Sequence, residues 1–267
     1  MTQQDAPTLR NPLAQTLAAG RVALAMIVQK TPSVDIAVAA ASCGFDALSI
    51  DLEHSVISEA SAAGISIAAL GAGVAPLVRV ASHDPHAIGR LLDAGALGIV
   101  APHVESAAQA KAIVAACRFA PQGTRSVSYH WPQLGYRAYE PSAMRTVLNE
   151  ATTVVVMLES PEAIERADEI AAVPGVDILH IGSLDLSDAL GVPGRMDDPR
   201  LGECFERVIG ACRRHGKVAG IGGVGGNAVV ARRVVSQGAR FLTAGIDWDF
   251  MLSAARSRVR SLRALEA

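Results

Sequence analysis

The sequence lacks the features that mark membrane-spanning and secreted proteins. No stretch of 18 consecutive apolar residues occurs among the 267 residues, so we expect no transmembrane helix. The opening MTQQDAPTLRNPLAQ has neither the basic nor the apolar region of a signal peptide. The four cysteines form no CxxC pair. We therefore expect them to be small core residues of a protein that works in a reducing compartment. We therefore expect a cytoplasmic protein.

Charge of either sign is also scarce. Charged residues make up 19% of the chain, and the formal net charge is −2. Binding to nucleic acid requires a basic face, so we expect no nucleic-acid partner. Half of the residues are apolar, which is enough for a large core. A chain of this length and composition is compatible with one large α/β domain.

Short apolar runs recur along the chain and alternate with amphipathic segments. The runs are rich in Val, Ile, Leu and Ala with little polar alternation, as expected for strands covered on both faces. Several of the intervening segments begin on Ser, Asp or Asn and end near Gly, which is typical of capped helices. The eight predicted strands span residues 22–28, 46–51, 75–80, 97–104, 153–160, 177–182, 218–223 and 240–246.

This alternation of eight strands with helices predicts a (β/α)8 barrel, that is, a TIM barrel of the α/β class with a single domain. A doubly wound open sheet is the alternative, because alternation alone does not prove that the sheet closes. We expect residues 1–11 to form a loose polar arm and residues 12–267 to form the barrel with a C-terminal helix.

One connection departs from the regular pattern. Residues 126–150 contain no predicted core strand but hold all three tyrosines and Trp131. Long loops in compact barrels are usually functional. The segment is therefore either an active-site lid or an aromatic clasp packed on the outer helices. Because it follows the fourth predicted strand, we expect this aromatic loop to begin on the catalytic face.

Titratable residues collect where the predicted strands end. In (β/α)8 enzymes the active site lies at the carboxyl ends of the strands. The second predicted strand ends in SIDLEHS and contributes Asp51, Glu53 and His54, so we expect this cluster in an active site rather than simply in water. Other predicted strands deliver Arg79, His103, Glu159, Ser160, Asp185 and Asp247 to the same end.

Glu159 and Asp185 follow neighbouring strands at the points where the apolar runs stop. Two carboxylates in one cavity repel each other unless a proton or a cation lies between them. Oxygen ligands with room for water favour Mg²⁺ or Mn²⁺. The alternative is structural, because Glu159 precedes the helix start at Ser160 and an acid there also stabilises a helix dipole. Asp185 has the same alternative, as a cap of the turn that follows it.

Arg79 lies between two valines in an apolar strand. A buried guanidinium needs an anionic partner, so we expect Arg79 on the lumen side of the barrel, facing a carboxylate or an anionic ligand. Further along, residues 220–225 read GIGGVG and match the GxGxxG pattern. The dinucleotide signal is weak because no acidic residue follows on a second strand. These glycines more readily let the backbone approach a substrate or a phosphate.

Seven segments, in order, resemble the HpcH/HpaI aldolase family, the class II pyruvate-dependent aldolases of the phosphoenolpyruvate/pyruvate barrel superfamily. They are FDALSIDLEHS, PLVRV, LLDAGALGIVAPHVES, CRFAPQGTRS, VVMLES, ILHIGSLDLSDALG and GARFLTAGID. The resemblance extends from residue 12 to about residue 255. The chain departs from the family at three positions: Met157 stands where the family aldolases have Gln, Ser183 where they have Pro, and Ser126 where they have Gly.

The resemblance implies a role for each of the residues at the strand ends. It implies that Glu159 and Asp185 bind a divalent metal ion and that Arg79 contacts the keto or enolate oxygen. It further implies that His54 pairs with Asp93. The substrate carboxylate is implied to lie against the backbone N–H groups of Ser183, Leu184 and Asp185.

The implied function is a lyase that cleaves or forms 4-hydroxy-2-oxo acids from pyruvate and an aldehyde. The pyruvate enolate would be stabilised by Mg²⁺, Mn²⁺ or Co²⁺, and either His54 or a water on the metal would transfer the proton. Family members are commonly hexamers, trimers of dimers that exchange the last helix, so we expect a homo-oligomer. Two alternatives remain: a CoA-ester lyase of the citrate/malyl type, and a catalytically weak metal-binding barrel, which Met157 favours.

Overall fold

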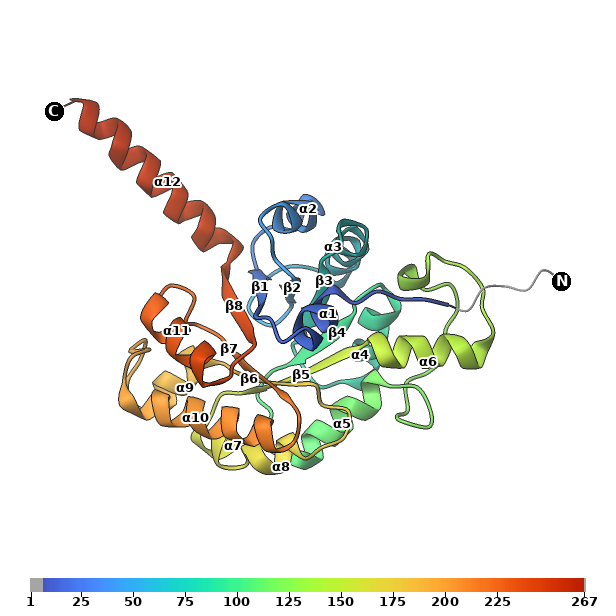
Figure 1. Ribbon diagram of the computed structural model, residues 1–267. Coiled ribbons are helices and arrows are strands. Elements are labelled where there is room, and N and C mark those ends of the chain that lie inside the picture. Colours follow the sequence, from blue (N-terminus) through green and yellow to red (C-terminus); the bar gives the residue numbers. More distant parts are fainter. Residues whose placement is uncertain (1–6, 267) are drawn as a thin grey trace.

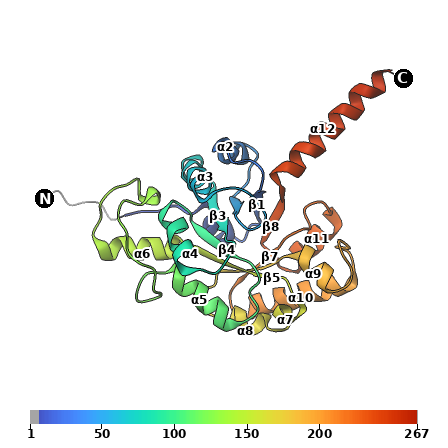
Figure 2. The same ribbon diagram turned by 180° about the vertical axis from the view of Figure 1, so that it is seen from behind.

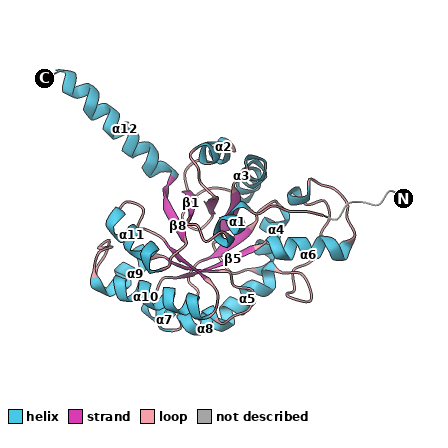
Figure 3. Cartoon of the chain, in the orientation of Figure 1, coloured by secondary structure: helices cyan, strands magenta, loops and turns pink. Residues whose placement is uncertain are grey.

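The structure is a computed structural model that describes residues 7–266. Eight parallel strands pair in chain order and close into a barrel, because β1 also pairs with β8. The strands lie at the centre and the helices surround them (Figure 3). The predicted (β/α)8 barrel is confirmed, and the open sheet is excluded. The strands are β1 (Ala23–Val28), β2 (Ala47–Asp51), β3 (Ala75–Arg79), β4 (Gly98–Ala101), β5 (Thr153–Leu158), β6 (Ile178–Ile181), β7 (Val218–Ile221) and β8 (Phe241–Ile246).

Helices connect each strand to the next on the outside of the barrel (Figure 1). Asp84, Ser106, Ser160 and Asn227 each cap a helix by accepting a hydrogen bond from a backbone N–H of its first turn, as the sequence predicts. The helices are α1 (Pro12–Ala18), α2 (Asp35–Ser42), α3 (Glu59–Ala72), α4 (Pro85–Asp93), α5 (Ala107–Cys117), η1 (Pro132–Leu134), α6 (Pro141–Ala151), α7 (Pro161–Glu165), α8 (Ala167–Ala171), α9 (Ser183–Ala189), α10 (Pro199–Arg214), α11 (Ala228–Gln237), α12 (Asp247–Arg263) and η2 (Ala264–Glu266).

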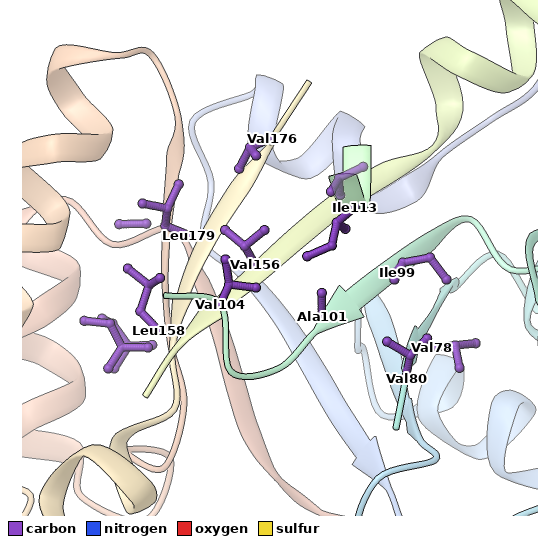
Figure 4. Close-up of a cluster of buried hydrophobic side chains, with 14 of the residues drawn as sticks. Val78, Val80, Ile99, Ala101, Val104, Ile113, Val156, Leu158, Val176 and Leu179 are labelled. Carbon is purple, nitrogen blue, oxygen red and sulfur yellow. The ribbon is translucent and has the colours of Figure 1, made fainter. Parts of the chain in front are cut away.

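The strands bury both of their faces, in two separate apolar clusters. One cluster fills the layer between strands and helices, and Figure 4 shows part of it, including Val78 and Val156. The other cluster contains Leu77, Val155 and Ile178 and fills the barrel lumen. Because side chains alternate along a strand, residues 79, 157, 159 and 180 share the lumen side with this second cluster. The expected lumen position of Arg79 follows from that alternation.

The aromatic segment does not begin on the catalytic face, so that expectation is wrong. α5 follows β4 and returns the chain to the amino ends of the strands before the segment starts. Trp131 is buried and packs edge-on against Phe119, with ring centroids 6.2 Å apart, in a small cluster with Leu134 and Met144. The second half of the segment forms α6. The segment therefore packs as an aromatic clasp and does not form a lid over the pocket.

The two ends of the chain differ in how they meet the barrel. Residues 1–6 of the expected arm lie outside the described residues. Asn11 is buried, and its side-chain amide donates to the carbonyl of Ala151 at 2.8 Å, which holds this part of the chain to the barrel. α12 instead projects away from the barrel in both views (Figures 1 and 2). Among the described residues, no helix combines the length and apolarity needed to cross a membrane.

Candidate active site

A charged pair on two neighbouring strands forms one wall of the site. Asp51 and Arg79 are partners in the β2–β3 register. The guanidinium donates to both oxygens of the Asp51 carboxylate, with Nε–Oδ1 at 2.9 Å and Nη2–Oδ2 at 2.6 Å. Burial alone would raise the pKa of Asp51, but the hydrogen bond and charge of Arg79 leave that pKa below its usual value. The bidentate contact holds the guanidinium plane in a fixed orientation.

Glu53 and His103 continue this charged wall towards Glu159. Nη1 of Arg79 lies 3.2 Å from Oε2 of Glu53, whose Oε1 lies 2.8 Å from Nε2 of His103. The backbone N–H of His103 donates to Oε2 of Glu159 at 2.8 Å, and its ring Nδ1 lies 3.2 Å from the same oxygen. His103 adopts a φ of 53°, a left-handed conformation that few non-glycine residues adopt. The strained backbone thus supports one oxygen of Glu159.

Glu159 and Asp185 are the two carboxylates that could hold a metal ion. Burial raises the pKa of Glu159; the hydrogen bond and charge of His103 oppose this, and the charges of Asp185 and Glu53 raise the pKa further. A cation would relieve this repulsion. Gly182 leaves the space that Glu159 occupies, since a Cβ there would stand 2.5 Å from Oε1 of Glu159.

These two carboxylates fit a hard divalent ion that keeps open coordination positions. No group of three or more His, Cys, Asp or Glu side chains among the described residues is arranged to hold a metal. Mg²⁺ commonly takes only one or two protein carboxylates and completes its shell with water and substrate oxygens. The structural alternative for Glu159 is not supported, because Ser160 caps α7 and Glu159 bonds to His103 instead.

The pocket in front of these residues has a volume of about 180 Å³. It opens at the carboxyl ends of the strands, where the sequence predicts the active site. Ser183, Leu184 and Asp185 line it from the first turn of α9. The N–H groups of a first helical turn have no partner within the helix, so they are free to bind an anionic group. His54 also lines the pocket, with its Nε2 3.6 Å from Oε2 of Glu53.

Asp93 does not pair with His54 within this chain. It is the last residue of α4, which starts at the carboxyl end of β3 and ends near the amino end of β4. There its Oδ1 accepts hydrogen bonds from Nη2 of Arg125 at 2.6 Å and from Nε1 of Trp131 at 3.1 Å. One barrel places the two residues at opposite ends, so the expected pairing of His54 with Asp93 stays a prediction that requires a second subunit.

Two other residues have roles that the sequence did not reveal. Asp247 accepts hydrogen bonds from the backbone N–H groups of residues 29–31, so it fastens the end of β1 and is structural. His180 lines the pocket from the middle of β6. A histidine inside the apolar run DILHIG was the available signal for a lumen-facing polar group.

Comparisons with known proteins show which family the chain resembles in sequence and fold. A model of the HpcH/HpaI aldolase/citrate lyase family matches residues 27–254. The chain is 41% identical over 239 residues to a 4-hydroxy-4-methyl-2-oxoglutarate aldolase of Hapsidospora irregularis, covering 87% of each chain. It is 36% identical to a hydroxypyruvate/pyruvate aldolase of Rhizorhabdus wittichii, covering 92% of this chain and 96% of the relative. The crystal structure of an HpcH/HpaI aldolase from Desulfitobacterium hafniense matches with a TM-score of 0.89 at 28% identity, covering 94% of this chain and 96% of the other.

Proposed function

Since the chain belongs to the HpcH/HpaI aldolase/citrate lyase family, we propose that the pocket described above is its active site and that it works with a divalent metal ion on a 2-oxo acid. The chain is a carbon–carbon lyase of the aldolase type, as its named relatives at 36–41% identity are. The observation that carries the proposal is the placement of Glu159 and Asp185 beside Arg79 in one pocket at the carboxyl ends of the strands.

The substrates that suit this pocket are small. A volume of about 180 Å³ accommodates a short 2-oxo acid rather than a large ligand. The relatives named as acting on 4-hydroxy-4-methyl-2-oxoglutarate and on hydroxypyruvate or pyruvate support the same class. The proposed reaction therefore cleaves or forms a 4-hydroxy-2-oxo acid, with pyruvate and an aldehyde as the two parts.

Each residue of the site has a role in this chemistry. Glu159 and Asp185 would hold Mg²⁺, Mn²⁺ or Co²⁺, which when bound supplies Lewis-acid stabilisation of the enolate oxygen. Arg79, fixed by Asp51, donates to the keto oxygen where negative charge develops. The backbone N–H groups of residues 183–185 bind the substrate carboxylate. His54 stands at the pocket edge and can take the proton that leaves the 4-hydroxyl group, since histidine exchanges protons near neutral pH.

The proposed active site also requires a second copy of the chain. Because Asp93 lies at the far end of its own barrel, it can act on a His54 only from another subunit. α12 projects into solvent and exposes Trp248, Met251, Val259 and Leu262, whose spacings of three, eight and three residues put them on one face of the helix. We propose that a partner subunit covers this face, in a homohexamer built as a trimer of dimers. The four cysteines are free, which supports a cytoplasmic location.

The proposed function is tested with pyruvate and a panel of aldehydes, with and without Mg²⁺, Mn²⁺ and Co²⁺. We expect aldol products that require both pyruvate and a metal ion. A melting temperature that responds to a CoA thioester but not to pyruvate would instead indicate a CoA-ester lyase. If no aldehyde reacts with any of the metals, the barrel is at best catalytically weak and the proposal is wrong.

A further inference from the structure

His180 is a buried polar residue that the roles above leave unused. It is 3% exposed, yet it lines the same pocket as Arg79 and Glu159. Its Nδ1 is buried and has no hydrogen-bond partner among the described residues. Burial, together with the charge of Arg79, lowers the pKa of His180 to about 3, so the ring is neutral. Nδ1 lies against Gly220, which does not line the pocket, whereas Nε2 lies beside the pocket-lining Gly222. Buried polar groups in proteins are normally hydrogen-bonded, so Nε2 is the nitrogen for which a ligand in the pocket can serve as partner.

The strand beside His180 is built to make room for its ring. His180 is the register partner of Gly220 on β7. A Cβ on Gly220 would stand 2.6 Å from Nδ1, and a Cβ on Gly222 would stand 2.9 Å from Nε2. The ring also packs edge-on against Phe241, with centroids 5.4 Å apart. The first glycines of the GIGGVG segment therefore leave space for this side chain, and the imidazole is held in one place.

Among the described residues, no side chain or backbone group forms a hydrogen bond with Nδ1 of the ring. Its register partner on the other side is Met157, whose thioether is only a weak acceptor. Thr243 also lies next to Gly222, because a Cβ on Gly222 would stand 3.0 Å from Oγ1 of Thr243. Thr243 lines the pocket as well. His180 and Thr243 thus add neutral polar groups to a pocket that also holds the charged Arg79 and Glu159.

We propose that His180 is a further substrate-binding residue, whose Nε2–H, beside the pocket-lining Gly222, donates a hydrogen bond to an oxygen of the bound 2-oxo acid from inside the barrel. The inference rests on the proposed function, because a 2-oxo acid must occupy the pocket. Such an acid offers only acceptor oxygens at its reactive end, so the imidazole has to be the donor. A neutral imidazole carries one N–H and can donate it without adding charge to the site.

Two variants separate a hydrogen bond from a packing role. His180→Phe keeps an aromatic ring against Phe241 but removes the N–H, whereas His180→Gln keeps an N–H at similar reach. Using Mg²⁺-loaded protein and oxalate as a planar dianionic probe, we expect calorimetry to show about a 10-fold weaker Kd for His180→Phe, equivalent to about 1.4 kcal/mol. His180→Gln should recover most of the affinity. Mg²⁺ affinity should stay unchanged in both, and His130→Phe, outside the pocket, serves as the control.

The imidazole itself provides a second readout. In protein labelled with ¹⁵N-histidine, the His180 signals are identified by their loss in His180→Phe. Oxalate with Mg²⁺ should shift the Nε2 signal of the wild type and leave the ring neutral. Unmoved His180 signals, together with wild-type oxalate affinity in His180→Phe, would overturn the inference alone. If wild-type protein with Mg²⁺ binds neither oxalate nor pyruvate, the proposed function fails and the inference fails with it. If His180→Phe does not fold, the oxalate affinity of His180→Gln and the response of the wild-type His180 signals to oxalate still test the inference.

Discussion

At the scale of single residues, Arg79 shows how far a sequence argument reaches. An arginine between two valines in an apolar strand predicts a lumen position and an anionic partner, and the structure has both. Which acid makes the bidentate contact does not follow from the sequence, because Asp51 and Glu53 both stand near the end of the neighbouring strand. The β2–β3 register decides it: residue 51 stands directly beside residue 79. Register depends on how the barrel closes, which is a property of all the strands together.

The first prediction concerns Arg79→Lys. A lysine keeps the charge but cannot keep the bidentate contact with Asp51, and it cannot present the planar fork to an enolate oxygen. We expect kcat to fall by about 100-fold or more, equivalent to about 3 kcal/mol of transition-state stabilisation, with metal affinity little changed. Steady-state kinetics measure the fall. Arg90→Lys, at an exposed ion pair with Glu59, is the matched control. Wild-type kinetics in the folded fraction of Arg79→Lys would make Arg79 a structural residue only.

The second prediction concerns Asp51→Asn. Removing one partner of a buried ion pair leaves Arg79 with Glu53 alone, so we expect the free energy of unfolding at pH 7 to fall by about 3 kcal/mol. The pKa of Asp51 is lower in the folded state, so its stabilising contribution is present above the unfolded pKa and is lost as pH falls towards the folded pKa. The difference in the free energy of unfolding between wild type and variant should therefore become smaller below about pH 4. Urea unfolding measured across this pH range tests it, with the exposed Asp188→Asn as the control. A difference that does not change with pH would contradict the account.

At the scale of elements, periodicity predicts what local sequence determines. All eight strands follow from apolar runs, and their bounds differ from the prediction mainly in β4, which ends at Ala101 before Pro102. The aromatic segment was harder to interpret. Its second half forms α6, with Glu140 as the cap and Pro141 as the first residue, a helix signal that the tyrosines obscured. The end of the barrel on which the segment lies depends on the direction of α5, and composition carries no information about that.

The third prediction distinguishes a clasp from a lid. Phe119 is fully buried in the aromatic cluster, so Phe119→Ala should lower the free energy of unfolding by about 3–5 kcal/mol. Tyr129 lies in the aromatic segment itself, residues 126–150, but is 79% exposed. Tyr129→Ala should therefore change neither stability, beyond about 0.5 kcal/mol, nor the KM for the 2-oxo acid. Thermal or urea unfolding measures the stability of each variant, and steady-state kinetics measure its KM. A raised KM in Tyr129→Ala would indicate that the segment closes over a pocket.

At the scale of the whole molecule, the barrel contains the pocket, but two features of the chain are not explained by a single barrel. α12 carries apolar side chains that point to solvent, and Asp93 lies at the wrong end of its own barrel to meet His54. The sequence could indicate a C-terminal helix and an acid in LLDAG, but it could not show that both face away from the pocket of the same chain. Both features are explained if subunits share their elements, which is the oligomer proposed above.

The fourth prediction follows from that proposal. The native protein should sediment at about six times its chain mass of 27.7 kDa. Leu262→Asp places a charge on the apolar face of α12, where Leu262 is 57% exposed in the single chain, and should shift the protein to smaller species. Ser257→Asp, on the opposite face of the helix, should leave the mass unchanged. Analytical ultracentrifugation reads out both variants. A monomeric wild type, or equal masses for the two variants, would contradict the shared-helix arrangement.

The central claim is that this barrel forms a pyruvate enolate at a metal held by Glu159 and Asp185. The most direct test is the exchange of pyruvate methyl protons for deuterium in D₂O, followed by NMR. We predict exchange with the wild type and Mg²⁺ or Mn²⁺, its loss on treatment with EDTA, and its loss in Glu159→Ala and Asp185→Ala, while circular dichroism shows that both variants stay folded. Exchange that persists after EDTA, or pyruvate that borohydride traps on a lysine, would contradict the account.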